Sequence, residues 1–427
     1  MKKILCLTII VATLFGLVAC TDPAPEPAQP VVEATEETMP PAEGIAPHPM
    51  QRKEYVPASG ANATPDELRA IAVQIMEDNL SIQWNTDHFL YYSKRVGLTG
   101  KKYTFSPGLV FSGMPYTDGA SGIVQWMEFY DNETGLFSWP GTGAELDGNM
   151  GNSCASCVWA AWHAVCNSVT SGATTHNMVA VNGALPVGPY TYPTGLKAWT
   201  DYPTEQVCAD NGKDIMFQSY AEILPADGLV STLDAHAIMA KEAAHVEYLK
   251  DGSIDGENSY VIIMDQRAGK GDYFYVEMDG ETELLHSGRT SAKYTFNEFF
   301  DLGYLPCCPA EFKGTDPYEL PEVSFSNPNA ASVDDLMKGN VVSNYPVAVT
   351  RLVLVAPDGE ENIIGRILLR NYDVGRGKAK NVPISEMANA LTEQAYLDAL
   401  EAGGYKLQIV AILYNGQFYT VAEVPVG

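Results

Sequence analysis

The chain has 427 residues and a formal net charge of −27, because 53 acidic side chains face only 26 basic ones. Such a charge repels phosphate backbones, so the composition argues against a nucleic-acid partner and is compatible with a basic or partly neutral ligand. Apolar residues make up 46% of the sequence, enough for the two hydrophobic cores that a chain of this length predicts.

The N-terminus predicts export. Two lysines precede the apolar run ILCLTIIVATLFGLVAC, which is too short and too close to the N-terminus for a membrane span to be expected. Residues 17–20, LVAC, resemble the lipobox of bacterial lipoproteins, in which the signal is removed and the new N-terminal cysteine is lipidated. The resemblance implies a signal over residues 1–20, lipidation at Cys20 and a protein anchored to the bacterial cell envelope, facing outside the cytoplasm; an ordinary signal peptide is the alternative.

Residues 21–60 are acidic and rich in proline and glutamate, which predicts a disordered tether. A helix should follow, because Thr64 is a good N-cap, Pro65 fits the first helical position and Glu67 completes a capping box. The stretch from about 100 to 150 has no sustained period and is rich in Gly, Tyr, Asp and Asn. It predicts long loops with short helices, which are often part of a site.

Residues 154–165 are apolar on nearly every side, which predicts a helix buried in the centre of a domain. Six strands are then expected, at 214–217, 228–230, 236–240, 245–249, 260–264 and 273–278. Short turn-rich gaps between them predict an antiparallel meander. The fold class is therefore α+β, with one central helix against a sheet, over a domain of residues 61–315.

Four prolines between residues 309 and 328 mark the expected domain boundary. Residues 325–427 predict a small, mostly β, sandwich-like domain, with one helix at about 385–401 and a hairpin turn at Asn415 and Gly416. It contains no cluster of residues suited to chemistry, so we expect it to bind a protein or a glycan.

Cys154 is the candidate nucleophile, because a thiol at a helix start lies among unpaired backbone N–H groups that favour the thiolate. A nucleophile needs a base and the base needs an orienting partner. His163 is on the same helix but roughly 13 Å along its axis, so His236, which opens a predicted strand, is preferred, with His245 as the alternative. Asp265 and Gln266 face opposite ways at the end of the next strand, and we rank Gln266 above Asp265 as the orienting residue.

These residues resemble the NlpC-type papain-fold cysteine peptidases. In that family the nucleophile lies in an Asp-Cys-Ser-Gly-Phe-Val motif, and residues 153–158, SCASCV, occupy the corresponding places. A Pro-Gly-Asp-Leu-Val type stretch precedes the histidine strand there, and residues 225–230, PADGLV, are similar. The resemblance implies that Cys154 is the nucleophile and His236 the base. It also implies that Tyr116, or less well Trp139, holds the oxyanion, and that the substrate is a cell-wall peptide.

Three other interpretations stay open. Cys154 and Cys157 form a CxxC at a helix start, as in thiol–disulfide oxidoreductases. A zinc site would need more ligands at regular spacing, and a catalytically inactive papain-like module would bind wall peptides or a partner protein. The sequence has no HExxH, Walker or GxGxxG motif, so no cofactor or metal is expected.

Overall fold

The structure is a computed structural model that describes residues 46–92, 103–105, 107–140, 146, 150–169, 183–195, 202–267, 274–278, 282–286 and 288–426. The expected signal, Cys20 and residues 21–45 of the expected tether lie outside the described residues. The described chain is an α+β protein with several antiparallel sheets, as the sequence predicts, and residues 42–427 form one compact unit. Within the described residues, no helix combines the length and the apolar character that a membrane crossing requires.

Two helices form the centre of the fold. Helix α1 (Pro65–Ser81) begins as predicted, because the Thr64 side chain accepts a hydrogen bond of 3.3 Å from the backbone N–H of Glu67. Helix α3 (Cys154–Val165) has the predicted bounds, and all of its residues are buried. The two helices contact each other, and both pack on the largest sheet. The all-round apolar pattern of α3 thus reflects contacts on every side.

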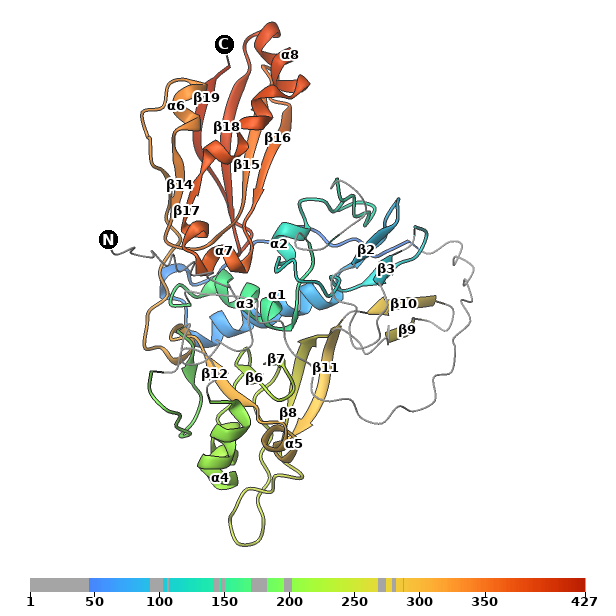
Figure 1. Cartoon of the computed structure of the whole chain (residues 1–427), viewed down its shortest axis with the longest axis vertical. Coiled ribbons are helices and arrows are strands. Elements are labelled where there is room, and N and C mark those ends of the chain that lie inside the picture. Colours follow the sequence, from blue (N-terminus) through green and yellow to red (C-terminus); the bar gives the residue numbers. More distant parts are fainter. Residues whose placement is uncertain are drawn as a thin grey trace, which may run out of the picture. The chain divides into compact units, whose positions relative to one another are not determined.

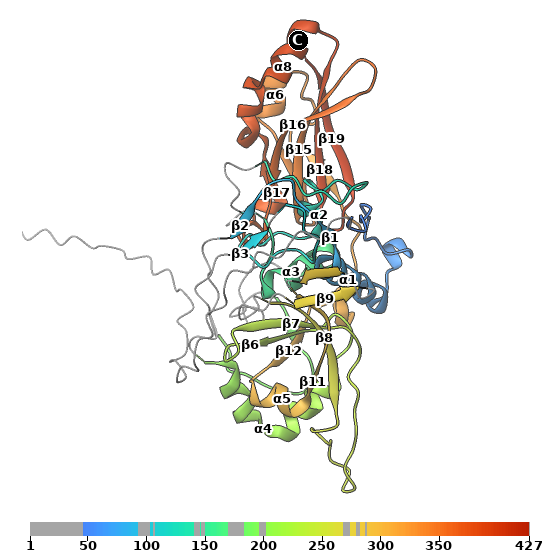
Figure 2. The ribbon, with the colours of Figure 1, turned by 90° about the vertical axis from the view of Figure 1, so that its right-hand side faces the viewer.

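The largest sheet has six strands in the order β11 (Gly288–Thr295), β8 (Tyr260–Gln266), β7 (His236–Ala240), β6 (Gly228–Ser231), β12 (Leu305–Cys308) and β5 (Leu185–Pro186). All neighbours in it are antiparallel. Figures 1 and 2 show α1 and α3 on one side of this sheet, with α4 (Thr204–Ala221) and α5 (Phe296–Asp301) on the other. The predicted strands at 228–230, 236–240 and 260–264 are therefore confirmed.

Three of the predicted strands are wrong as members of this meander. Residues 214–217 lie in α4, because their short apolar run belongs to a helical face that continues to Tyr220. Residues 245–249 form a loop in which only isolated bridges join His245 to Tyr260 and Tyr248 to Ile254. Residues 274–278 are a strand, β9 (Phe274–Met278), but they pair in a separate sheet ordered β1 (Gln83–Trp84), β4 (Phe111–Ser112), β10 (Thr282–His286), β9.

The stretch from 100 to 150 contains short elements, as expected, where the structure describes it. Strand β3 (Tyr103–Phe105) pairs with β2 (Leu90–Tyr92), and the short helix α2 (Ile123–Trp126) follows β4. A cluster of aromatic rings joins these elements, with Trp84 lying between Phe105, Phe111 and Trp126 at centroid distances of 4.6–5.1 Å. Ring packing, rather than a regular period, holds this region together.

Residues 46–60, which we name the N-terminal strap, differ from the predicted disordered tether. Tyr55 is buried, its hydroxyl donates to Asp78 over 2.7 Å, and its backbone N–H donates to Asn415 O over 2.7 Å. Lys53 pairs with the same Asp78 carboxylate at 2.8 Å. The strap is held by a few separate contacts with distant residues, and such contacts leave no periodic pattern in a proline-rich sequence.

The C-terminal part contains two antiparallel sheets. One has the order β13 (Val323–Phe325), β14 (Asn340–Ser343), β17 (Asn381–Pro383), and the other β16 (Glu361–Leu368), β15 (Val347–Val355), β18 (Lys406–Leu413), β19 (Phe418–Pro425). The hairpin at Asn415 and Gly416 is confirmed, and Gly416 has the positive φ of 81° that favours glycine there. The remaining helical segments of this part are α6 (Val333–Met337), α7 (Asn371–Gly375) and α8 (Gln394–Ala402), with 3-10 segments at Lys378–Lys380 and Ile384–Thr392.

The helix predicted at 385–401 is broken, because Glu393 between the 3-10 segment and α8 is extended, with ψ of 147°.

The C-terminal part also contacts helices α2 and α3 directly. The side-chain amide of Asn371 donates to Ser156 O over 2.8 Å, and that of Gln125 donates to Leu369 O over 2.8 Å.

Candidate active site

Cys154 is the first residue of helix α3, and its neighbours fix the helix start there. Ser153 is the N-cap, and a capping box forms because Ser156 N–H donates to Ser153 Oγ over 3.5 Å while Ser153 N–H donates to Ser156 Oγ over 2.6 Å. Ser153 and Ser156 therefore cap the N-terminal end of the helix. The thiol lies at the positive end of the helix dipole, where a thiolate is favoured, and the residue is 5% exposed.

His236, the first residue of β7, is hydrogen-bonded to Cys154 and to Asp265. Its Nε2 lies 2.9 Å from Asp265 Oδ2, which leaves Nδ1 as the nitrogen for the thiol. Burial by itself would lower the pKa of His236, but the hydrogen bonds to Asp265 and Cys154 raise that pKa to about 9. An imidazole with this pKa is protonated at neutral pH.

His236 is hydrogen-bonded to Asp265 at 2.9 Å, which favours Asp265 over Gln266, against the order that the sequence suggested. Side chains alternate along β8, so the two residues face opposite ways, and the Gln266 side-chain amide donates to Met114 O over 2.7 Å instead. The sequence did not favour Asp265 over Gln266, because the cation that pairs with the Asp265 carboxylate is distant in sequence.

That cation is Arg289, which the sequence analysis did not single out. It is the register partner of Asp265 on β11, and it donates to both carboxylate oxygens at 2.8 and 2.7 Å. Arg267 adds a contact of 3.3 Å. Burial tends to raise the pKa of Asp265, but the hydrogen bonds from Arg289 and His236 outweigh it and hold the pKa well below its usual value.

Tyr116, the residue that the resemblance suggests for the oxyanion, lies beside the start of α3. Tyr116 and Asn152 form a parallel β-bridge, in which Thr117 N–H donates to Asn152 O over 2.9 Å and Asn152 N–H donates to Pro115 O over 3.1 Å. The weaker candidate, Trp139, packs its ring against Phe129 at 4.8 Å.

Asn152 is a buried residue that the sequence analysis missed. Its side-chain amide donates to Asn79 Oδ1 of α1 over 3.2 Å. This contact and the pairing with residues 115–117 position the backbone that leads into Cys154. An asparagine in a Gly- and Asn-rich stretch carried no sequence signal for that role.

The other candidate residues lie apart from this arrangement. Cys157 is buried with its sulfur 3.2 Å from Met76 Sδ, and burial raises the pKa of its thiol far above the ordinary value, so it behaves as a core residue. His245 is exposed and bonded to Glu247 at 2.9 Å. No disulfide joins the six cysteines of the described chain: Cys154, Cys157, Cys166, Cys208, Cys307 and Cys308.

Within the described part of the chain, no group of three or more His, Cys, Asp or Glu side chains is placed to hold a metal ion. Comparisons of the chain with protein-family models, with curated proteins and with solved structures each gave no significant match.

Proposed function

We propose that Cys154, His236 and Asp265 are the catalytic residues of a papain-like cysteine peptidase or amidase that cleaves amide bonds in cell-wall peptides. The observation that carries the proposal is the hydrogen bonding of one imidazole to both a helix-start thiol and a buried carboxylate. Nucleophile, base and orienting group in this order are the arrangement that acyl transfer needs.

The mechanism follows from the charges. His236 takes the proton of Cys154 and holds it, since its pKa is raised to about 9, and the thiolate attacks an amide carbonyl. The backbone N–H of Cys154 at the helix start and Tyr116 stabilise the oxyanion. His236 then gives its proton to the leaving amine and later activates the water that hydrolyses the acyl-enzyme.

The location of the protein is part of the same proposal. A lipid anchor at Cys20 would attach the chain to the bacterial cell envelope, and the segment between Cys20 and the N-terminal strap would let the catalytic residues reach wall peptides. The C-terminal part would dock on a protein or a glycan.

A second function is favoured by the burial of the site. Cys154 is 5% exposed and His236 is 6% exposed, so little of the thiol meets solvent. A papain-like module that binds peptides without cleaving them would tolerate such a covered thiol, whereas a peptidase must bring a carbonyl carbon into contact with it.

Alkylation and substrate assays separate the candidates. For the peptidase, iodoacetamide should label Cys154 quickly near neutral pH, His236→Ala should slow the labelling, and a panel of defined muropeptides should show a mass change on cleavage. Cys154→Ser should abolish the fast labelling and the cleavage. The control Cys208→Ser, at another buried cysteine, should leave the labelling and the cleavage unchanged. A slow thiol with no cleavage across the panel would support the binding module, and a reversible bridge between Cys154 and Cys157 would support redox chemistry.

A further inference from the structure

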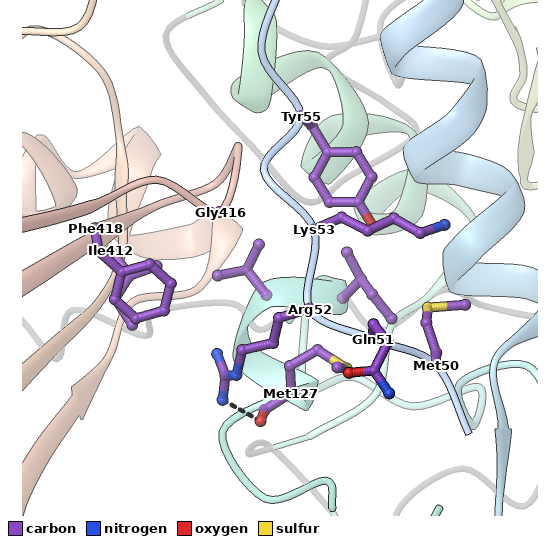
Figure 3. Close-up of a pocket in the computed structure, with 11 residues that line it drawn as sticks. Met50, Gln51, Arg52, Lys53, Tyr55, Met127, Ile412, Gly416 and Phe418 are labelled. Atoms are coloured by element: carbon purple, nitrogen blue, oxygen red, sulfur yellow. Dashed lines mark hydrogen bonds between the residues drawn. The ribbon is translucent and has the colours of Figure 1, made fainter. Parts of the chain in front are cut away.

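A hollow that opens to solvent lies among the N-terminal strap, the α2 region and the β18–β19 hairpin. Figure 3 shows the Arg52 guanidinium hydrogen-bonded to Met127 on one side, with Phe418 and Ile412 on its other side. Its apolar walls are buried side chains, such as Val124 and Ile412, together with the half-exposed ring of Phe418.

Beside this hollow, one buried carboxylate meets three guanidinium groups. Glu128 accepts hydrogen bonds from Arg52 at 3.1 Å, from Arg351 at 2.8 and 2.6 Å and from Arg366 at 3.3 Å. Three positive charges against one negative charge leave an excess of two in this group, in a chain whose net charge is −27.

Two of the three guanidinium groups lie near the ring of Phe418, which lines the hollow. The guanidinium of Arg52 lies 5.9 Å from the centroid of its ring and that of Arg351 lies 5.2 Å from it. Burial lowers the pKa of Arg52, and repulsion from Arg351 and Arg366 acts in the same direction, against the attraction of Glu128. Like charges held this close are unfavourable unless another anion joins them.

The cluster also retains hydrogen-bond donors. Arg366 reaches Glu128 only through Nε, so its two terminal nitrogens have no acceptor among the described residues, and neither does Nη1 of Arg351. The Arg366 side chain is 30% exposed, so solvent and a ligand can reach it. Guanidinium groups with two parallel N–H donors match a carboxylate.

We propose that this hollow binds a small carboxylate ligand with an apolar body, the class that includes N-acylated amino acids and the C-terminal residue of a peptide. The carboxylate lies at the arginine cluster and the apolar part lies between the α2 side chains and Phe418. The site is separate from Cys154, so its test does not depend on catalysis.

Calorimetric titration with two matched probes tests the proposal. N-acetyl-leucine should bind, and N-acetyl-leucinamide, which has the same shape without the charge, should bind at least about tenfold more weakly. Arg366→Gln should weaken N-acetyl-leucine by a similar factor, and Phe418→Ala should weaken it without a change in charge. The controls Lys338→Gln, which removes an exposed positive charge elsewhere, and Cys154→Ser should leave binding unchanged.

Several results would overturn the site. These are the absence of binding by the carboxylate at millimolar concentration, equal binding of the amide, and undiminished binding in Arg366→Gln. If Arg366→Gln lowers only the melting temperature and the carboxylate has no effect on the parent chain, the cluster is a structural clamp between the strap and the C-terminal sheet.

Discussion

Replacing Asp265 by Asn removes the negative charge that lies against His236 and keeps the shape of the side chain. The pKa of His236 is about 9, against an ordinary value of 6.5, although burial acts to lower it. A carboxylate in hydrogen-bond contact accounts for a shift of about one to three pKa units. We therefore expect Asp265→Asn to lower the pKa of His236 by roughly two units, which corresponds to about 3 kcal/mol of lost preference for the imidazolium.

The assay is a proton NMR titration of the histidine rings, with His236 assigned by the signal that disappears in His236→Gln. The rate of Cys154 alkylation at pH 6.5 should fall at least tenfold in parallel, since a thiolate without an imidazolium beside it is less favoured. Glu247→Gln is the matched control, because it removes a carboxylate bonded to a histidine at the same 2.9 Å on the surface. A His236 midpoint within about 0.3 units of the parent would refute the assigned role of Asp265.

Three further outcomes are expected. Because the folded pKa of His236, about 9, lies above the unfolded value of 6.5, its charge stabilises the native state below pH 6.5. This contribution, of about 3 kcal/mol, is lost as pH rises through 9, so urea unfolding should show that pH dependence in the parent and not in His236→Gln. Arg69→Met strands the buried Asp227, bonded at 2.6 Å, and should lower the free energy of unfolding by about 3–5 kcal/mol. His163→Phe should raise the melting temperature, because both ring nitrogens of this buried histidine lack a partner within the described chain, and an unchanged or lower temperature would contradict this.

The candidate site was predictable from sequence where a local signal marked each residue. A capped apolar helix start predicted Cys154, and a polar residue opening an apolar strand predicted His236. The choice between Asp265 and Gln266 was not predictable, because it depends on Arg289, which joins the site only through the register of β8 with β11. Strands β9 and β10, which belong to another sheet, lie between β8 and β11 in the chain. The register of β8 with β11 is therefore set by tertiary packing and not by a local turn.

The fold shows the same division between local and distant signals. Helices α1 and α3 have capping residues and sustained apolar faces, and both begin where the sequence predicts. The four-residue run at 214–217 fits a strand or a helix equally, and only its burial against the sheet decides for α4. The order of the N-terminal strap was not predictable for a related reason. Tyr55 is a single aromatic residue, and its partners, Asp78 and Asn415, are distant in sequence.

The charges around the site explain why its protonation state is constrained. Asp265 and Asp234 are paired with Arg289 and Arg267, so these four groups sum to zero. The protonation of Cys154 and His236 then sets the net charge of the site, and burial disfavours a single net charge there. The helix start and Asp265 favour an ion pair of thiolate and imidazolium, whereas Arg289 withdraws part of the carboxylate charge from His236. Arg289 thus limits how strongly His236 holds its proton, which matters because a base that never releases the proton cannot deliver it to a leaving amine.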